Sequence, residues 1–133
     1  MVDRYLFRGK RLDNGEWVQG CVALGKPFGS EISIATIIEL DTLSFGVEID
    51  PTSIGQYTGV KDKRGVLIFE GDVLRVMFDD CKFVGAVRYG ETCVSSCTFY
   101  VDTGNGVKLL HQHNKNHIEI IGNIHDNPEL LEG

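Results

Sequence analysis

Short stretches of alternating apolar and polar residues recur along this chain, separated by turns rich in glycine, asparagine and aspartate. This pattern is typical of β-strands that bury one of their two faces. In the first half it predicts strands over Tyr5–Arg8, Glu16–Leu24, Ile32–Leu40 and Phe45–Ile49. In the second half it predicts strands over Val73–Phe78, Phe83–Tyr89, Thr98–Val101, Val107–Leu110 and His117–Ile124. The chain therefore reads as a series of short strands.

The pattern predicts one helical element, a single turn near the C-terminus that Asn127 caps and Pro128 begins. Many short strands joined by glycine turns predict an all-β fold. The Glu70–Val73 step is typical of the sharp turn that leads into a strand of an SH3-like small barrel. We expect an N-terminal β-hairpin segment over 1–50 and an SH3-like barrel domain over 51–133, with a boundary near Asp50–Pro51. The alternative is one continuous domain.

Composition places the chain among ordinary globular proteins, with 133 residues, 42% hydrophobic and 24% charged. The N-terminal residues contain no apolar leader, and the apolar runs are too short to span a membrane. We therefore expect a cytoplasmic protein that makes no membrane contact. In that compartment the four cysteines, Cys21, Cys81, Cys93 and Cys97, are expected to be reduced thiols.

The formal net charge is -6, which disfavours general binding to a nucleic-acid backbone. One segment departs from this average, because Arg4, Arg8, Lys10 and Arg11 are clustered near Trp17. Arginine beside aromatic residues is one way to bind nucleic acid or a phosphorylated ligand. The alternative is that these cations pair with carboxylates of the chain itself or of a second subunit, and the net charge favours this alternative.

Three segments together resemble the YopX family, which is found mainly in bacteriophages and prophages. They are Phe7–Arg11 with Asp13–Val18; Ile54–Gly59 with Asp62, Lys63, Gly65 and Glu70–Val73; and Ile118–Leu131. The resemblance implies an all-β fold with an SH3-like barrel, a gene carried by a phage or prophage, and assembly of the protein with itself. It implies no catalytic residues, because none are established for the family.

The spacing of Cys93, Cys97, His113 and His117 approaches that of a two-cysteine, two-histidine zinc site. Zinc fingers present their two histidines on one face of a helix, whereas this region reads as hairpin strands. A second arrangement, His111 and His113 on one face of a strand, has no stronger basis. We expect neither a metal site nor a cofactor.

No catalytic constellation can be recognised in the sequence. A cysteine with a histidine nearby could act as a nucleophile, but nothing marks one cysteine as activated. Gly55, Gly59, Gly65 and Gly71 do not form a phosphate-binding loop, and we expect them to be turn residues with positive φ. We therefore expect a protein that is not an enzyme.

The remaining candidate binding residues are of types that small barrels use on their binding faces. They are Trp17, Gln56, Tyr57, Asp62 and Lys63, with Trp17 alternatively in the core. The leading hypothesis is a phage accessory protein that associates with itself and binds a host or phage protein. The alternative is a nucleic-acid-binding module that uses the basic cluster from Arg4 to Arg11.

Overall fold

The computed structural model describes residues 6–25, 34–38, 46–78, 80–90, 98–104, 106–110 and 115–131, and these residues form an all-β protein. The chain divides into two compact units, Met1–Tyr57 and Thr58–Gly133. The boundary predicted from the sequence was near Asp50–Pro51. Residues just beyond that point are tied to the first unit, because Ser53 Oγ accepts a hydrogen bond from Lys10 N at 2.8 Å. No helix among the described residues is long and apolar enough to cross a membrane.

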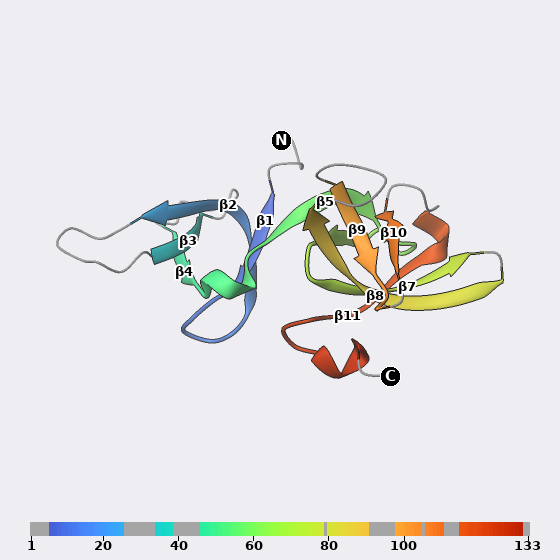
Figure 1. Cartoon of the computed structure of the whole chain (residues 1–133). Helices are drawn as coiled ribbons and strands as arrows, with labels where there is room; N and C mark the ends of the chain where they lie inside the picture. The colour runs from blue at the N-terminus through green and yellow to red at the C-terminus, as the bar shows by residue number, and fades with distance from the viewer. Residues whose placement is uncertain are drawn as a thin grey trace. The chain divides into compact units, whose positions relative to one another are not determined.

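The first unit is an antiparallel sheet with the strand order β4-β3-β2-β1. Its strands are β1 (Phe7–Lys10), β2 (Trp17–Gly25), β3 (Ile34–Ile38) and β4 (Val47–Ile49) (Figure 1). The residues after β1 return to β4, where Arg11 forms a bridge with Ile49. Asp50 N also donates to Lys10 O at 2.9 Å. The sheet is therefore rolled around a small core of Ala35, Ile37 and Ile49.

Two strand glycines allow this rolled sheet to pack closely. A Cβ on Gly9 would collide with Ile49 Cδ1, which belongs to the core. A Cβ on Gly20 would collide with the main-chain oxygen of Ile38 and lie 2.8 Å from its carbonyl carbon. A main-chain atom of a paired strand cannot move aside as the tip of a side chain can. Gly20 is therefore required by the close approach of β2 and β3.

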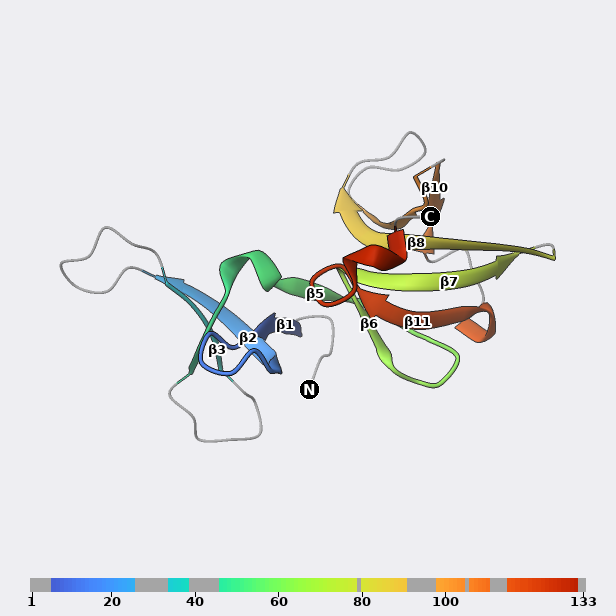
Figure 2. The same ribbon diagram turned by 90° about the horizontal axis from the view of Figure 1, so that it is seen from below.

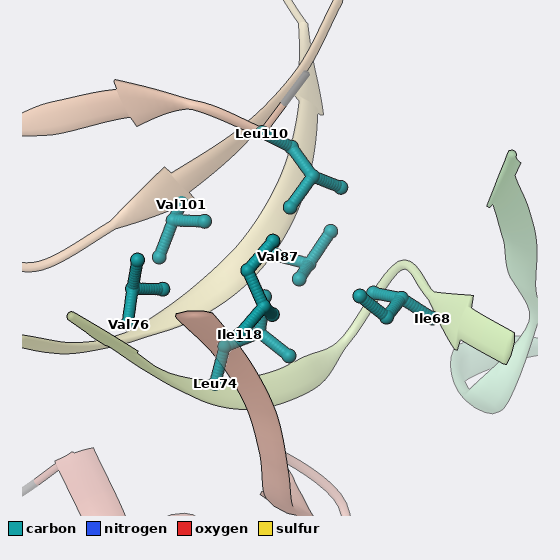
Figure 3. Close-up of a cluster of buried hydrophobic side chains, with 7 residues drawn as sticks. All are labelled: Ile68, Leu74, Val76, Val87, Val101, Leu110 and Ile118. Atoms are coloured by element: carbon teal, nitrogen blue, oxygen red, sulfur yellow. The ribbon is translucent and has the colours of Figure 1, made fainter. Parts of the chain in front are cut away.

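The second unit contains a five-stranded antiparallel sheet with the order β10-β9-β8-β7-β11. Its strands are β7 (Asp72–Phe78), β8 (Cys81–Gly90), β9 (Thr98–Asp102), β10 (Val107–Leu109) and β11 (Ile118–Asn123). β7 lies between β8 and β11 (Figure 2). One face of the sheet packs on a cluster of fully buried aliphatic side chains, Ile68, Leu74, Val76, Val87, Val101, Leu110 and Ile118 (Figure 3).

Strand β5 (Gly55–Lys61) begins in the first unit and ends in the second, where it pairs with β6 (Leu67–Phe69). A tight turn joins β6 to β7. Gly71 has a φ of 93°, and its N–H donates to Val87 O at 2.9 Å. The buried Asp72 closes the turn, because its Oδ2 accepts the N–H of Phe69 at 2.8 Å. The Glu-Gly-Asp-Val segment is thus a hydrogen-bonded turn.

The C-terminal helical turn is present as the 3-10 helix η5 (Pro128–Leu131). The Asn127 side chain accepts the N–H of Asn123 at 3.3 Å, and the Asn127 carbonyl accepts the N–H of Leu130 at 3.1 Å. η5 contacts β8. The described residues also include the short 3-10 helices η2 (Pro51–Ser53), which Asp50 caps, and η4 (Lys115–His117).

The predicted all-β class is confirmed, but the described strands do not close into the expected SH3-like barrel. β10 and β11 lie at opposite edges of the five-stranded sheet and do not pair with each other. The physical reason lies in the turn between β5 and β6. This turn hydrogen-bonds along the side of β11 that faces away from β7, as Lys63 N donates to Ile118 O at 2.9 Å. The position at which a closing strand would pair is therefore occupied.

Because β2 and β3 approach closely at Gly20, adding a single methyl group there should reduce the stability of the protein substantially. Gly20→Ala should lower the free energy of unfolding by about 1–3 kcal/mol, the usual cost of forcing one extra carbon into a packed region. Urea denaturation followed by tryptophan fluorescence measures the loss. Gln19→Ala, at the neighbouring exposed position of β2, is the control and should leave stability nearly unchanged. Equal stabilities of the two variants would contradict the steric explanation.

Candidate functional site

Strand β1 carries part of the basic cluster on one face. Arg8 and Lys10 are two residues apart, so their side chains lie on the same side of the strand. Lys10 is directly opposite Trp17 of β2. Arg8 Cζ lies 4.6 Å from the centre of the Trp17 ring, and Lys10 Nζ lies 5.7 Å from it. Cations at these distances are attracted to the electron-rich face of an indole. The structure therefore brings three candidate residues together, while Arg4 lies outside the described residues.

Arg11 belongs to a different contact. Its Nε and Nη2 donate to the two carboxylate oxygens of Asp13 at 2.9 and 2.7 Å. The hydrogen bond from Arg11 lowers the pKa of the Asp13 carboxyl, and the positive charge of Arg11 adds to this effect. Asp13 is largely exposed, so the pair contributes little to stability. It compensates the charge of Arg11, whereas the cations beside the Trp17 ring are Arg8 and Lys10.

Gln56 and Tyr57 lie at the start of β5, beside β1. Gln56 is directly opposite Phe7 and is half-buried. Tyr57 N donates to Leu6 O at 2.9 Å, and the tyrosine is only 6% exposed. A tyrosine this deeply buried presents little surface to a partner. Its packing beside β1 gives it a structural role in this structure.

Asp62 is a buried carboxylate that binds three main-chain N–H groups. Its Oδ1 accepts from Arg64 N at 2.9 Å and from Val66 N at 3.0 Å, which fixes the turn between β5 and β6. Its Oδ2 accepts from Ile120 N at 3.2 Å, which attaches that turn to β11. Burial by itself raises the pKa of Asp62, but the N–H groups of Val66, Ile120 and Arg64 together lower it below its usual value.

Lys63, the residue after this carboxylate, lies in an exposed ion-pair network. Lys63 Nζ is 3.1 Å from one oxygen of Glu119, and Arg75 Nη1 is 2.9 Å from the other. The hydrogen bond from Lys63 is the main cause that lowers the pKa of Glu119. Arg64 also reaches β11, with Nη2 donating to Ile120 O at 3.0 Å. Asp62 and Lys63 are thus brought together, and both form hydrogen bonds with the edge of β11 that faces away from β7.

A hollow of about 610 Å³ in the second unit contains cations that the sequence analysis did not select. Its charged lining residues are Lys82, Arg88, Lys108 and Asp102, and we call it the cationic hollow. The alternation of β8 places Lys82 and Arg88 on one face. The alternation of the predicted strand could therefore have indicated that these two residues share a face. The position of Lys108 depends on where the β9–β10 hairpin packs, and no local sequence motif predicts this.

Most of the cysteines and histidines considered for a metal site, Cys93, Cys97, His111 and His113, lie outside the described residues. Cys21 and Cys81 are exposed free thiols, and His117 is exposed in η4. In the part of the chain that the structure describes, no three side chains of histidine, cysteine, aspartate or glutamate are grouped as metal ligands. The described residues thus contain no assembled metal centre.

The chain was also compared with known proteins. The model of a protein family described as YopX protein matches residues 6–132, which is nearly the whole chain. No curated protein matches the chain. The match includes the segments that contain Asp62, Asp72 and Asn127, whose side chains hold turns together.

The two oxygens of Asp62 allow its two roles to be separated. In Asp62→Asn the amide oxygen can still accept the turn N–H groups, but the amide nitrogen cannot accept from Ile120 N. The variant should lose about 2–3 kcal/mol of unfolding free energy at neutral pH, because a charged hydrogen bond is lost and a main-chain donor is left without its acceptor. Urea denaturation measures this loss, with Asp80→Asn in an exposed turn as the charge-matched control.

The loss should depend on pH with a defined sign. Because the folded pKa of Asp62 is lowered, its contribution is complete above the unfolded pKa of about 3.9 and disappears as the pH falls through the folded value. The stability difference between the native protein and Asp62→Asn should therefore shrink as the pH falls below about 4. A difference that stays constant at low pH would show that the carboxylate charge is not its cause.

Proposed function

This chain belongs to the YopX protein family, and on that premise we propose that it is a non-enzymatic phage or prophage accessory protein that associates with itself. Such a protein would act in the cytoplasm of the bacterial host, where it would present its assembled surface to a host or phage protein. The proposal that the protein is not an enzyme is supported by the structural role of two polar residues in the matched segments. Asp62 and Asp72 are buried and bind main-chain N–H groups, which makes them structural.

The unequal edges of the five-stranded sheet carry the self-association proposal. The edge at β11 is covered by the β5–β6 turn through Asp62, Lys63 and Arg64. The edge at β10 has β9 as its only strand neighbour among the described residues. Exposed strand edges are common sites of pairing between protein chains. Two copies could pair their β10 strands antiparallel about a two-fold axis and form one continuous sheet.

The hydrogen-bond pattern of the β9–β10 hairpin determines which main-chain N–H groups of β10 point away from β9. Thr103 N donates to Gly106 O at 3.0 Å, so hydrogen-bonded pairs recur at every second residue from there. Val107 is opposite Asp102, between two such pairs, and its N–H points away from β9. Its side chain is 41% exposed. Nearby on the same sheet, Tyr89 and Phe99 pack with ring centres 4.8 Å apart, and Tyr89 is exposed. Aromatic side chains of this kind are enriched in protein interfaces.

A proline at Val107 tests this arrangement without removing a bond within the sheet. Val107→Pro lacks only the N–H that points outward, and proline is tolerated on edge strands at such positions. Light scattering should give a multiple of the 14.8 kDa chain mass for the native protein and a single chain mass for Val107→Pro. Val107→Thr keeps both the shape and the N–H, and should assemble normally. A monomeric native protein, or an unchanged mass for Val107→Pro, would contradict pairing through β10.

A second candidate function is nucleic-acid binding through β1, favoured by the position of Arg8 and Lys10 around Trp17. Arg8→Glu should then weaken binding of a fluorescent single-stranded oligonucleotide by about tenfold, and native binding should weaken steeply with salt. Lys61→Glu, at an exposed position of β5, is the control for charge reversal. Absent binding, or binding that does not change with salt, would remove this candidate.

A further inference from the structure

The hollows on this chain differ in how their charges are balanced. A hollow of about 150 Å³ is lined by Lys63, Arg75, Lys82 and Glu119. There Lys63 and Arg75 both pair with Glu119, at 3.1 and 2.9 Å. In a hollow of the first unit, of about 390 Å³, Arg11 pairs with Asp13. An anion that entered either hollow would compete with a carboxylate already in place. Neither is suited to binding an anionic ligand.

The cationic hollow also has three cations and one carboxylate in its lining, but among the described residues no ion pair joins that carboxylate to any of these cations. Among the described residues, neither Lys82 nor Arg88 forms an ion pair. The carboxylate, Asp102, is engaged in the hairpin turn, where its Oδ1 accepts the N–H of Gly104 at 3.0 Å. Lys108 Nζ lies 5.8 Å from the centre of the Phe83 ring. Positive charge therefore exceeds negative charge around this hollow.

The same hollow has an apolar wall. Leu130 and Leu131 of η5 line it, opposite residues of β8 that include Val84 and Ala86. Phe83 also lines the hollow, but its side chain packs against the buried cluster on the other face of the sheet. A volume of about 610 Å³ is in the range of pockets that hold small organic ligands, roughly 300–1,000 Å³. Apolar walls with a few polar groups are the usual composition of such pockets.

We propose that the cationic hollow binds a small organic dianion with an aromatic or apolar body. Lys82 and Arg88, on one face of β8, would attract its negative charges, and the leucines of η5 would contact its body. Two negative charges on the ligand match these two cations, because Asp102 is engaged in the hairpin turn. A phosphate ester and a dicarboxylate share this chemistry.

The charge of the whole chain decides between a small ligand and a polymer. A nucleic acid extends far beyond the hollow and meets the field of a protein with net charge -6. A small dianion stays within about one Debye length, roughly 8–10 Å, of the three cations, so their attraction dominates. The hollow therefore favours a ligand that it can contain.

Isothermal titration calorimetry on the full chain at neutral pH tests the proposal with three ligands. AMP is a phosphate dianion with an aromatic body, phthalate is an aromatic dicarboxylate, and adenosine has the body of AMP without its charge. At least one dianion should bind, and adenosine should bind about tenfold more weakly or not at all, a difference equivalent to about 1.4 kcal/mol. Binding of AMP alone identifies the charged group as a phosphate, and binding of phthalate alone identifies it as a dicarboxylate.

Matched variants locate the binding. Lys82→Gln and Arg88→Gln should each raise the dissociation constant about tenfold, as expected for the loss of one charged contact. Lys61→Gln removes one exposed lysine elsewhere on the second unit and should leave the constant unchanged. Thermal melting verifies that each variant is folded. The proposal is overturned if neither dianion binds at millimolar concentrations, if adenosine binds as tightly as AMP, or if Lys82→Gln and Arg88→Gln bind as the native protein does.

Discussion

The Asp62 carboxylate is the contact on which the arrangement of the second unit depends most. It joins two segments that lie 58 residues apart in the sequence, because one of its acceptor oxygens serves Arg64 and Val66 and the other serves Ile120. A buried carboxylate would be unfavourable without compensation, and three main-chain N–H groups supply it. This contact fixes the position of the β5–β6 turn, and the turn in turn covers the edge of β11. A loop thereby occupies the place where a further strand would otherwise pair.

Covering one edge of an open sheet leaves its two edges unequal. An edge whose N–H and C=O groups are already hydrogen-bonded is a poor template for another strand, whereas β10 still has one side available. β10 is only three residues long and contains Lys108, two features that natural proteins use to limit uncontrolled pairing. Pairing through so short a strand would need added side-chain contacts such as those of Tyr89. These features favour a limited, symmetric assembly over open-ended aggregation.

Alternation in the sequence was sufficient to locate most strands and the all-β class, because those strands bury one face and expose the other. β7 and β8 show this most clearly. Strands β5 and β6 were missed, since Gly55 and Gly59 interrupt the first and the second has only three residues. The prediction of positive φ is confirmed for Gly59, Gly65 and Gly71, but it is wrong for Gly55. Gly55 is a strand residue opposite Arg8. A local pattern cannot distinguish a glycine needed for a turn from one needed inside a strand.

The prediction of functional sites is limited for a similar reason, because contacts between residues far apart in the sequence leave no local pattern. Asp62 stood out as a polar residue in a matched segment, but its role depends on Ile120, which no local pattern connects with it. The cations of the cationic hollow could not be located from the net charge of -6, because a net charge does not say where individual charged residues lie. Two other groups of cations among the described residues have a carboxylate partner, since Asp13 pairs with Arg11 and Glu119 pairs with Lys63. Within the described residues neither Lys82 nor Arg88 forms an ion pair, so an anionic ligand would find its favourable field beside them and not over the surface as a whole.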